Sequence, residues 1–386
     1  MNINRLKTSI KGHGKTAFHT FLQNHDYRKD MLAKKFNAAH DCPPLSQADR
    51  KEIDAYWARY HVRFEDYEWH RMYYAVTGLH NPGFLPQPFA ERVLYPYYNR
   101  LDFAGAYADK NMFSSFVPGV HFPDCIGKRM NGWYYDSQGR LHSQVLTDAF
   151  IDSVYASFEE KSAGRIHDII CKEAIGSFQG QGVQKIRISS RQDLKDCLSQ
   201  NPSSDFIIQM AVQQHPFFAQ LNPDSVNIIR LTTWRTGSDV HIFSPCIRFG
   251  IPGSHTDVAV RNGVEIVNAV KIEPEGQIAD RYYTLDGDTQ PIPGLRETQI
   301  PCWDEIIRCV TSGALQLPHF RVIGWDVTVD DQRNVICIEY NLKTPGTVIY
   351  QYAHGPFAGQ CTDDLLAFLK DKNNIACIPA CIRIKS

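Results

Sequence analysis

The sequence predicts an α+β protein, because apolar residues recur at helical spacing in the N-terminal part and in extended runs in the second half. One helical stripe consists of Ile53, Tyr56, Trp57 and Tyr60. From residue 226 onward, β-rich runs alternate with short polar turns, as expected for antiparallel strands. A hairpin pattern then spans 323–346, where two β-rich arms enclose a turn rich in Asp, Asn and Gln.

The composition bounds the number of packed units and the kind of partner. The chain has 386 residues, of which 43% are hydrophobic, so we expect two or three packed units. Its 41 basic and 42 acidic residues nearly cancel, giving a formal net charge of −1. This balance provides no overall field to attract nucleic acid or a membrane surface. We therefore expect small-molecule partners and no nucleic-acid partner, whereas the oligomeric state is not indicated.

Hydropathy and cysteine usage indicate a compartment. No apolar run approaches the roughly 20 residues that cross a bilayer, and the N-terminus lacks the apolar core of a secretory signal. We expect no membrane span and a cytoplasmic location. The 11 cysteines are an odd number without a C-x-x-C pair, which favours reduced thiols over a disulfide framework or a zinc site.

Residues 1–90 are expected to form a helical N-terminal region. Ser46 followed by Asp49 matches a capping box at a helix start. A second helical stripe ends at Gly78, a residue suited to a helix C-cap. The Pro-rich segment 81–89 indicates a connector to the rest of the chain.

A Gly-rich segment follows a short predicted strand at 169–171. Gly176, Gly180 and Gly182 would let backbone N–H groups approach a phosphate closely. Their spacing matches neither a P-loop nor a dinucleotide-binding fingerprint. From the residues alone, the segment is either a phosphate-binding loop or a mobile surface turn.

Arg230 and Arg248 each lie inside a predicted strand of apolar or β-branched residues, over 227–235 and 240–249. A permanently charged guanidinium needs an anionic partner if it is buried. Two interpretations remain open, in which both side chains face solvent or both meet anions.

The hairpin brings Asp326 near Glu339 and Asn341, which are two residues apart and so share one face of an extended strand. Two carboxylates and an amide oxygen are hard ligands that suit Mg²⁺ better than Zn²⁺. The alternative is a hairpin with polar residues at its fraying ends. As metal ligands, we expect these side chains near the surface rather than in the core.

The hairpin resembles the metal-binding signature of the ATP-grasp superfamily at Asp326, Glu339, Asn341, Pro345 and Gly346. More narrowly, Ile-Gly-Trp-Asp at 323–326 and Ser-Val-Asn-Ile-Ile-Arg at 225–230 resemble the sugar-transfer-associated ATP-grasp family. The resemblance runs from about residue 45 to about residue 369. It implies the ATP-grasp fold, in which two α+β lobes grip ATP, with the three oxygen ligands holding two Mg²⁺ ions, for which Mn²⁺ could substitute.

The resemblance also implies phosphate contacts. Lys110, in an Asp-Lys pair, and Lys172, in the strand before the Gly-rich loop, would contact the ATP phosphates. The loop residues expected to fold over the β- and γ-phosphates include Gly176, Ser177, Gly180 and Gly182. Glu173 departs from the family pattern, in which proline usually follows the strand lysine.

A hinge between the lobes would bind adenine through its backbone, at Gln209, Met210, Ala211 and Val212. On the same resemblance, Arg230 would contact the transferred phosphoryl group and Arg248 would hold the carboxylate or its acyl phosphate. Contacts from Asp257 and Asn262 to the acceptor are in doubt, because Val258 replaces the asparagine that usually follows the aspartate.

The resulting organisation is a helical region over 1–90, a small lobe over 91–212 and a C-terminal lobe over 213–386. The implied activity is ATP-dependent carboxylate–amine ligation through an acyl phosphate. The family's association with surface polysaccharide biosynthesis suggests that an amino acid is joined to a sugar acid or another precursor. Two alternatives use the same residues, namely an ATP-dependent kinase and a non-catalytic nucleotide-binding assembly module.

Overall fold

The computed structural model describes residues 31–163, 167–175, 182–200, 204–254, 256–261, 264–371 and 374. The chain divides into two compact units, which are Met1–Leu94 with Gly355–Ser386, and Tyr95–His354. Helices and antiparallel sheets occur together, so the predicted α+β class is confirmed. The described residues contain no helix that is both long enough and apolar enough to cross a membrane. The lobe boundaries drawn from the sequence stay a prediction.

The first unit is helical. Its elements are α2 (Gln47–Ala58), α3 (Glu68–Thr77), α4 (Gln87–Phe89), the π-helical turn η1 (Ala90–Leu94), η3 (Gly359–Cys361), α13 (Thr362–Leu366) and η4 (Ala367–Lys370). The predicted capping box is confirmed, since Ser46 and Asp49 each accept the other's backbone N–H. Gly78 ends α3 in the left-handed conformation, with φ of 68°. Trp57 is fully buried and donates from Nε1 to the carbonyl of Pro82 at 2.7 Å.

The second unit begins with four short helices and a five-stranded antiparallel sheet. These elements are α5 (Tyr95–Tyr98), α6 (Ala104–Tyr107), η2 (Lys110–Met112), α7 (Phe113–Phe116), β1 (Cys125–Met130), β2 (Trp133–Asp136), α8 (Asp148–Ser162), β3 (His167–Glu173), β4 (Val183–Ile188), α9 (Arg191–Ser199) and β5 (Phe206–Met210). The strand order is β2-β1-β5-β3-β4. Thus β5, a strand in which all five residues are buried, is the central strand.

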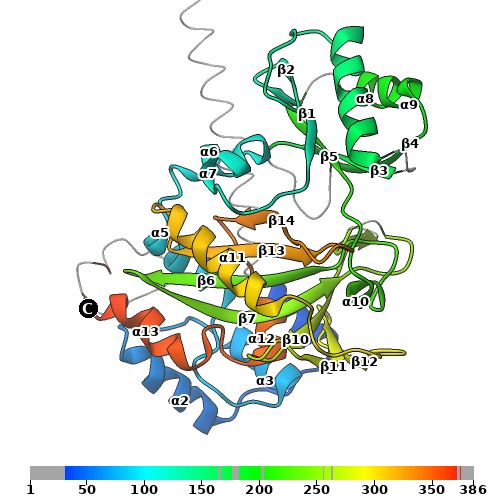
Figure 1. Ribbon diagram of the computed structural model, residues 1–386. Coiled ribbons are helices and arrows are strands. Elements are labelled where there is room, and N and C mark those ends of the chain that lie inside the picture. Colours follow the sequence, from blue (N-terminus) through cyan, green and yellow to red (C-terminus); the bar gives the residue numbers. More distant parts are fainter. Residues whose placement is uncertain are drawn as a thin grey trace, which may run out of the picture. The chain divides into compact units, whose positions relative to one another are not determined.

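Helices α8 and α9 cover one face of the five-stranded sheet (Figure 1). Apolar side chains of β1, β3 and β5 form a core with these helices, including Ile126, Ile169 and Ile208. Gly127 permits the close packing of α8, since a Cβ there would lie 2.7 Å from Val154 Cγ2. Because successive strand residues alternate between faces, the other face carries Lys172 and Gln209 together with Ile170 and Ile207.

A seven-stranded antiparallel sheet forms the rest of this unit. Its elements are α10 (Pro216–Ala219), β6 (Ile228–Thr236), β7 (Asp239–Phe249), β10 (Asn268–Ile272), β11 (Ile278–Thr284), β12 (Thr289–Pro291), α11 (Trp303–Gln316), β13 (Val322–Val329), β14 (Val335–Asn341) and α12 (Val348–His354), with the small β8 (Ala259–Arg261) and β9 (Val264–Ile266) pair inserted. The strand order is β12-β11-β10-β7-β6-β13-β14. The β-rich run over 264–272 is divided between β9 and β10.

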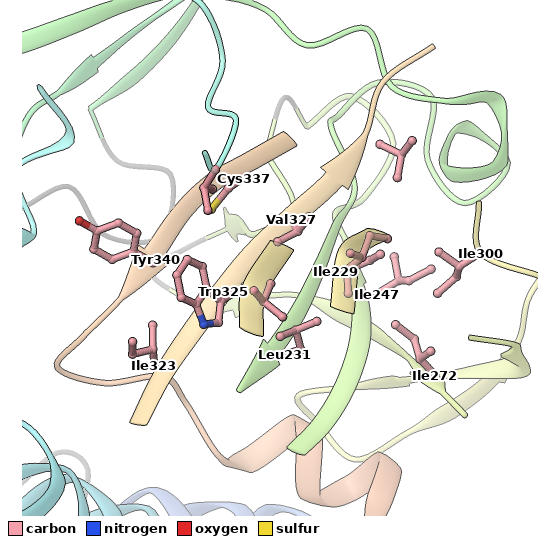
Figure 2. Close-up of a cluster of buried hydrophobic side chains, with 14 of the residues drawn as sticks. Ile229, Leu231, Ile247, Ile272, Ile300, Ile323, Trp325, Val327, Cys337 and Tyr340 are labelled. Carbon is pink, nitrogen blue, oxygen red and sulfur yellow. The ribbon is translucent and has the colours of Figure 1, made fainter. Parts of the chain in front are cut away.

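Helix α11 packs on one face of this sheet and encloses an apolar core with it. Figure 2 shows this core, with Ile323, Trp325 and Val327 on β13 beside side chains of β6, β7 and β14. The helix approaches closely because residue 313 is glycine, where a Cβ would lie 2.6 Å from the Trp325 ring. The residues between these apolar positions therefore point to the opposite face of the sheet, where α12 packs against β7 and β10.

Candidate active site

The register of β13 and β14 places the three predicted metal ligands on one face. Asp326 lies opposite Glu339, and Gly324 lies opposite Asn341. Gly324 and Asp326 share a face because they are two residues apart, as do Glu339 and Asn341. A β-bulge follows this pair, so that Val327 lies opposite Cys337 and Ile338 is the extra residue. The structure therefore brings together the ligands that the hairpin pattern predicted.

Asp326 is buried rather than near the surface, and our expectation about its exposure was wrong. Its side chain is only 2% exposed, because Arg230, opposite it on β6, pairs with both carboxylate oxygens. The second pairing distance, from Nη2 to Oδ2, is 2.7 Å. Burial alone would raise the pKa of Asp326, but Arg230 and Arg248 hold it below its ordinary value. Asp326 is therefore a buried, ionised carboxylate.

Arg230 donates most of its hydrogen bonds to other groups of the protein. Besides its two bonds to Asp326, it donates from Nη1 to the carbonyl of Pro345 at 2.7 Å and to the hydroxyl of Tyr350 at 3.4 Å. Its burial excludes the interpretation in which it faces solvent. The guanidinium thus fixes the Asp326 carboxylate and the Pro345–Gly346 turn, and its predicted contact with a phosphoryl group stays a prediction.

Arg248, on β7, is less completely paired than Arg230. Its Nη2 contacts the Asp257 carboxylate, and its Nη1 donates to the Tyr350 hydroxyl at 3.3 Å. The distance from Nη2 to Asp326 Oδ2 is 3.8 Å. The buried Nε of Arg248 has no hydrogen-bond partner among the described residues. Arg248 therefore retains a donor for a further anion or polar group.

Two side chains beside Arg248 extend the predicted site. Asp257 is half-buried, and burial raises its pKa although Arg248 opposes the shift. Tyr350, on α12, was not predicted, because a tyrosine in a short apolar helix carries no sequence signal of this role. Its hydroxyl accepts from both arginines and so holds the two guanidinium groups around one oxygen. Asn262 lies outside the described residues.

Of the two predicted phosphate lysines, Lys110 forms a salt bridge with Glu339, whereas Lys172 interacts with the Glu339 charge at longer range. Lys110 Nζ lies 3.8 Å from Glu339 Oε2, and the Lys110 backbone N–H donates to the carbonyl of Ala174, just beyond β3, at 3.0 Å. Burial lowers the pKa of Lys172 to about 8, with Lys110 lowering it further and Glu339 opposing the shift. Glu339 is half-buried, with 32% of its side chain exposed. The structure thus places both lysines near the hairpin that carries the predicted metal ligands.

The Gly-rich loop is described only at its two ends. Gly182 has φ of 72°, and its carbonyl accepts from the backbone N–H of Glu173 at 3.3 Å. A non-glycine residue is disfavoured at this φ. Gly176, Ser177 and Gly180 lie outside the described residues, so their predicted phosphate contacts stay predictions.

The predicted adenine-binding hinge is the end of β5 and the residues that follow. The N–H of Met210 donates to the carbonyl of Asp124 at 2.9 Å, and the N–H of Ala211 donates to that of Asp168 at 3.0 Å. The Gln209 side chain donates to the carbonyl of Pro123 at 3.1 Å. These three donors are used within the protein. An adenine contact of the predicted segment, which ends at Val212, would therefore use other backbone groups.

The hairpin fits a metal ion that arrives with a phosphate ligand. Asp326 accepts from Arg230 on both oxygens and from Asn341 Nδ2 at 3.2 Å on Oδ2, which leaves a lone pair on Oδ1. Across the described ranges, no group of three or more His, Cys, Asp or Glu side chains is placed to hold a metal by itself. Mg²⁺ typically uses one or two carboxylates together with substrate phosphates. Asp326, Glu339 and Asn341 match that requirement.

A family comparison matches residues 91–361 of the 386-residue chain to the sugar-transfer associated ATP-grasp family. This match covers both sheets and all the site residues described above. The chain therefore belongs to the sugar-transfer associated ATP-grasp family, as the resemblance in the hairpin indicated. The two antiparallel sheets, with the candidate site on both, have the two-part architecture of the ATP-grasp fold, which is confirmed.

Solved structures of ATP-grasp type are similar to the chain at low identity. An N5-carboxyaminoimidazole synthetase from Staphylococcus aureus, complexed with ADP, is 11% identical with a TM-score of 0.33, and the match covers 66% of this chain and 51% of that protein. The ATP-grasp ligase PsnB, complexed with a minimal precursor, is 15% identical with a TM-score of 0.39, covering 70% of this chain and 63% of PsnB. The chain thus spans between half and two thirds of their lengths. Among curated proteins, no match was found.

Proposed function

We propose that this protein is an ATP-dependent ligase that joins a carboxylate to an amine through an acyl-phosphate intermediate. The observation that carries the proposal is the ion-pair cluster on the sheet face, where Asp326, Arg230 and Arg248 lie beside Glu339, Asn341 and the two lysines. Phosphoryl transfer requires charge neutralisation and positioning more than a covalent group on the protein. The cluster supplies both cationic donors and oxygen ligands, and no nucleophilic side chain is needed.

The residues divide the work between the two substrates. Lys110 and Lys172 would bind the nucleotide phosphates, because both are buried cations near the Glu339 carboxylate and each acts on the charge of the other. Asp326, Glu339 and Asn341 would hold Mg²⁺, which when bound neutralises phosphate charge and fixes the phosphate oxygens. Arg248 retains an unpaired buried N–H and so is suited to the substrate carboxylate. The Tyr350 hydroxyl accepts a hydrogen bond from Arg248 and one from Arg230. It would thereby hold the Arg248 guanidinium in position for the substrate carboxylate.

The chemistry proceeds on the substrates while the protein orients them. The substrate carboxylate attacks the γ-phosphorus of ATP, and ADP leaves, which forms the acyl phosphate. The amine then attacks the acyl carbon, phosphate leaves and the amine proton is lost, so that an amide remains. Because the family is described by its association with sugar transfer, we propose a sugar acid and an amino acid as the first substrate pair to examine.

The test is a screen of acid and amine pairs for ADP release with Mg-ATP, followed by ¹⁸O labelling of the active acid. A ligase of this type transfers one labelled carboxylate oxygen to inorganic phosphate and forms the amide, which mass spectrometry detects. A phosphorylated acid that accumulates without needing the amine would instead identify a kinase. Nucleotide binding without turnover of any pair would contradict the proposal in favour of a non-catalytic module.

A matched pair of variants controls the screen. Glu339→Gln removes one carboxylate from the candidate site, and we expect it to lower turnover about a hundredfold or more. Glu305→Gln removes a carboxylate from α11, where Glu305 pairs with Arg308 on the exposed face. We expect this second variant to keep full activity, so that a loss in the first is not a general effect of charge.

A further inference from the structure

Lys128 lies in the same cross-strand row as Lys172, on the face of the five-stranded sheet away from α8 and α9. Ile207 of the central strand β5 lies opposite Lys172 of β3 on one side and opposite Lys128 of β1 on the other. Residues directly opposite one another on neighbouring strands share a face. The backbones of the two lysines are therefore about 10 Å apart, two strand spacings.

The core on the other face confirms this orientation of Lys128. Ile126 and Gly127 both face α8, because β1 has a register shift between Cys125 and Gly127. From Gly127 onward, the residues of β1 alternate between the two faces. The half-buried Lys128 side chain consequently lies on the face that carries Lys172. Its ammonium group donates to the carbonyl of Asn111 at 3.4 Å. Asn111 follows Lys110 in η2, so Lys128 is next to the segment that carries the first predicted phosphate lysine.

The charge of Lys128 is not balanced by a direct ion pair. Within the described part of the chain, its one hydrogen-bond partner is the neutral Asn111 carbonyl, and no carboxylate forms a salt bridge with it. An ammonium group has three N–H donors, so two remain. Its charge acts on Asp109, since Lys128 opposes the rise in the pKa of Asp109 that burial causes. A half-buried cation with free donors favours an anionic ligand.

We propose that Lys128 is a third anion-binding lysine of this site and contacts the phosphates of the bound nucleotide. The inference rests on the proposed nucleotide site and adds a residue that neither the motif nor the family resemblance pointed to. Three segments would then each bring one ammonium group to the same face, η2 with Lys110, β1 with Lys128 and β3 with Lys172. Such a set favours a polyphosphate over a monophosphate, because the ligand charge can be shared among three cations.

The first experiment measures the affinities of adenosine, AMP, ADP and Mg-ATP for the wild-type protein and for Lys128→Met by calorimetry. We expect adenosine to bind both proteins equally and Mg-ATP to bind the variant about tenfold or more weakly, as expected for a lost charged hydrogen bond. Lys128→Arg should recover part of the affinity, since it keeps the charge. An equal loss for adenosine and ATP would overturn the inference, because it would indicate a distorted site instead of a lost phosphate contact.

A second experiment separates direct contact from an effect through Lys110. If Lys128 only holds η2 in place, then Lys128→Met should cause no further loss of ATP affinity in a Lys110→Ala background. If Lys128 contacts phosphate, the two losses should add approximately. Additivity is the result we expect, and a complete absence of further loss would overturn the proposed contact.

The control is Lys195→Met, on α9 and hence on the opposite face of the sheet, where Lys195 pairs with the exposed Asp148. We expect this variant to bind ATP like the wild type. If the wild-type protein binds no nucleotide, the proposed function fails. If the wild type binds ATP and Lys128→Met binds it equally well, only the inference about Lys128 fails. Circular dichroism and thermal unfolding of each variant verify that the fold is retained.

Discussion

The candidate site has a buried half around Asp326 and a half-exposed half around Glu339, and the two halves are built differently. Asp326 is enclosed by Arg230, Arg248 and Asn341, with its charge compensated inside the protein. Glu339 lies directly opposite Asp326 but meets its nearest cation, Lys110, only at 3.8 Å. The Asp326 carboxylate is therefore closely paired with arginine inside the protein, whereas the Glu339 carboxylate has only a distant lysine as its cationic partner.

We infer from this difference that the half around Asp326 is preorganised and that the half around Glu339 rearranges when a ligand binds. A buried ion pair with good geometry is costly to disturb, because removing one partner leaves a charge in a low-dielectric environment. A half-exposed carboxylate beside loosely spaced lysines can change partners when phosphates and a metal ion enter. We therefore expect substitutions in the buried half to affect folding and those in the exposed half to affect ligand binding and turnover.

The largest effect is expected for Asp326→Asn. The substitution leaves Arg230 and Arg248 without their shared carboxylate, which should cost about 3–5 kcal/mol of folding free energy. We expect urea unfolding to show this loss and turnover to be abolished. The double variant Asp326→Asn, Arg230→Met removes both members of the pair and should recover part of the stability without recovering activity. If Asp326→Asn unfolds like the wild type, the buried pair does not have the structural role that its geometry indicates.

Glu339→Gln should reduce turnover while leaving the fold intact. The side chain is partly exposed, so we expect the unfolding free energy to stay within about 0.5 kcal/mol of wild type. Loss of a ligand that stabilises transferred charge should lower kcat about a hundredfold or more. Steady-state kinetics with ADP release measures the effect. Turnover at the wild-type rate would exclude Glu339 from the metal-binding set.

Lys172→Met should weaken Mg-ATP binding by about 1–3 kcal/mol, the range for a lost charged hydrogen bond. The change also removes a buried ammonium group and so should not destabilise the protein strongly. Calorimetric titration with Mg-ATP tests this expectation, with adenosine as the ligand that lacks phosphate. An unchanged ATP affinity would show that Lys172 does not contact phosphate.

The smallest expected effect is a pH dependence of ATP affinity. Burial lowers the pKa of Lys172 to about 8, below its ordinary value of 10.5, so the ammonium form predominates below pH 8 and is lost as pH rises through 8. ATP affinity should consequently fall above pH 8, by at most about tenfold per pH unit from this group. Binding should also take up protons near pH 8, which calorimetry in buffers of different ionisation enthalpy detects. In Lys172→Met, the proton uptake near pH 8 should disappear.

Local patterns predicted the hairpin and helix boundaries well, because the forces that set them act between neighbouring residues. The capping box at Ser46 and the shared face of Glu339 and Asn341 follow from spacing alone. The burial of Asp326 could not be predicted in this way. It depends on Arg230, which is 96 residues away in sequence and becomes its partner only through the β6–β13 register.

Residues outside the motifs were harder to find for a related reason. Tyr350, on helix α12, was recognised because it accepts hydrogen bonds from two arginines, one on β6 and one on β7. Lys128 is one of several lysines in its part of the chain, and only the registers with β5 place it in line with Lys172. Strand order and register are long-range properties, so single-sequence patterns carry little information about these two side chains.

The β-bulge in the hairpin of β13 and β14 also predicts how the protein responds to the deletion of one residue. Cys337 lies in the apolar core and Glu339 faces the site, although residues two apart normally share a face. Ile338 is the one-residue insertion that allows this change of side. Deleting Ile338 should therefore restore regular alternation, with Cys337 still inside and Glu339 still on the site face. We expect the hairpin to keep its fold after this deletion, while the Glu339 carboxylate loses the local kink that sets its direction.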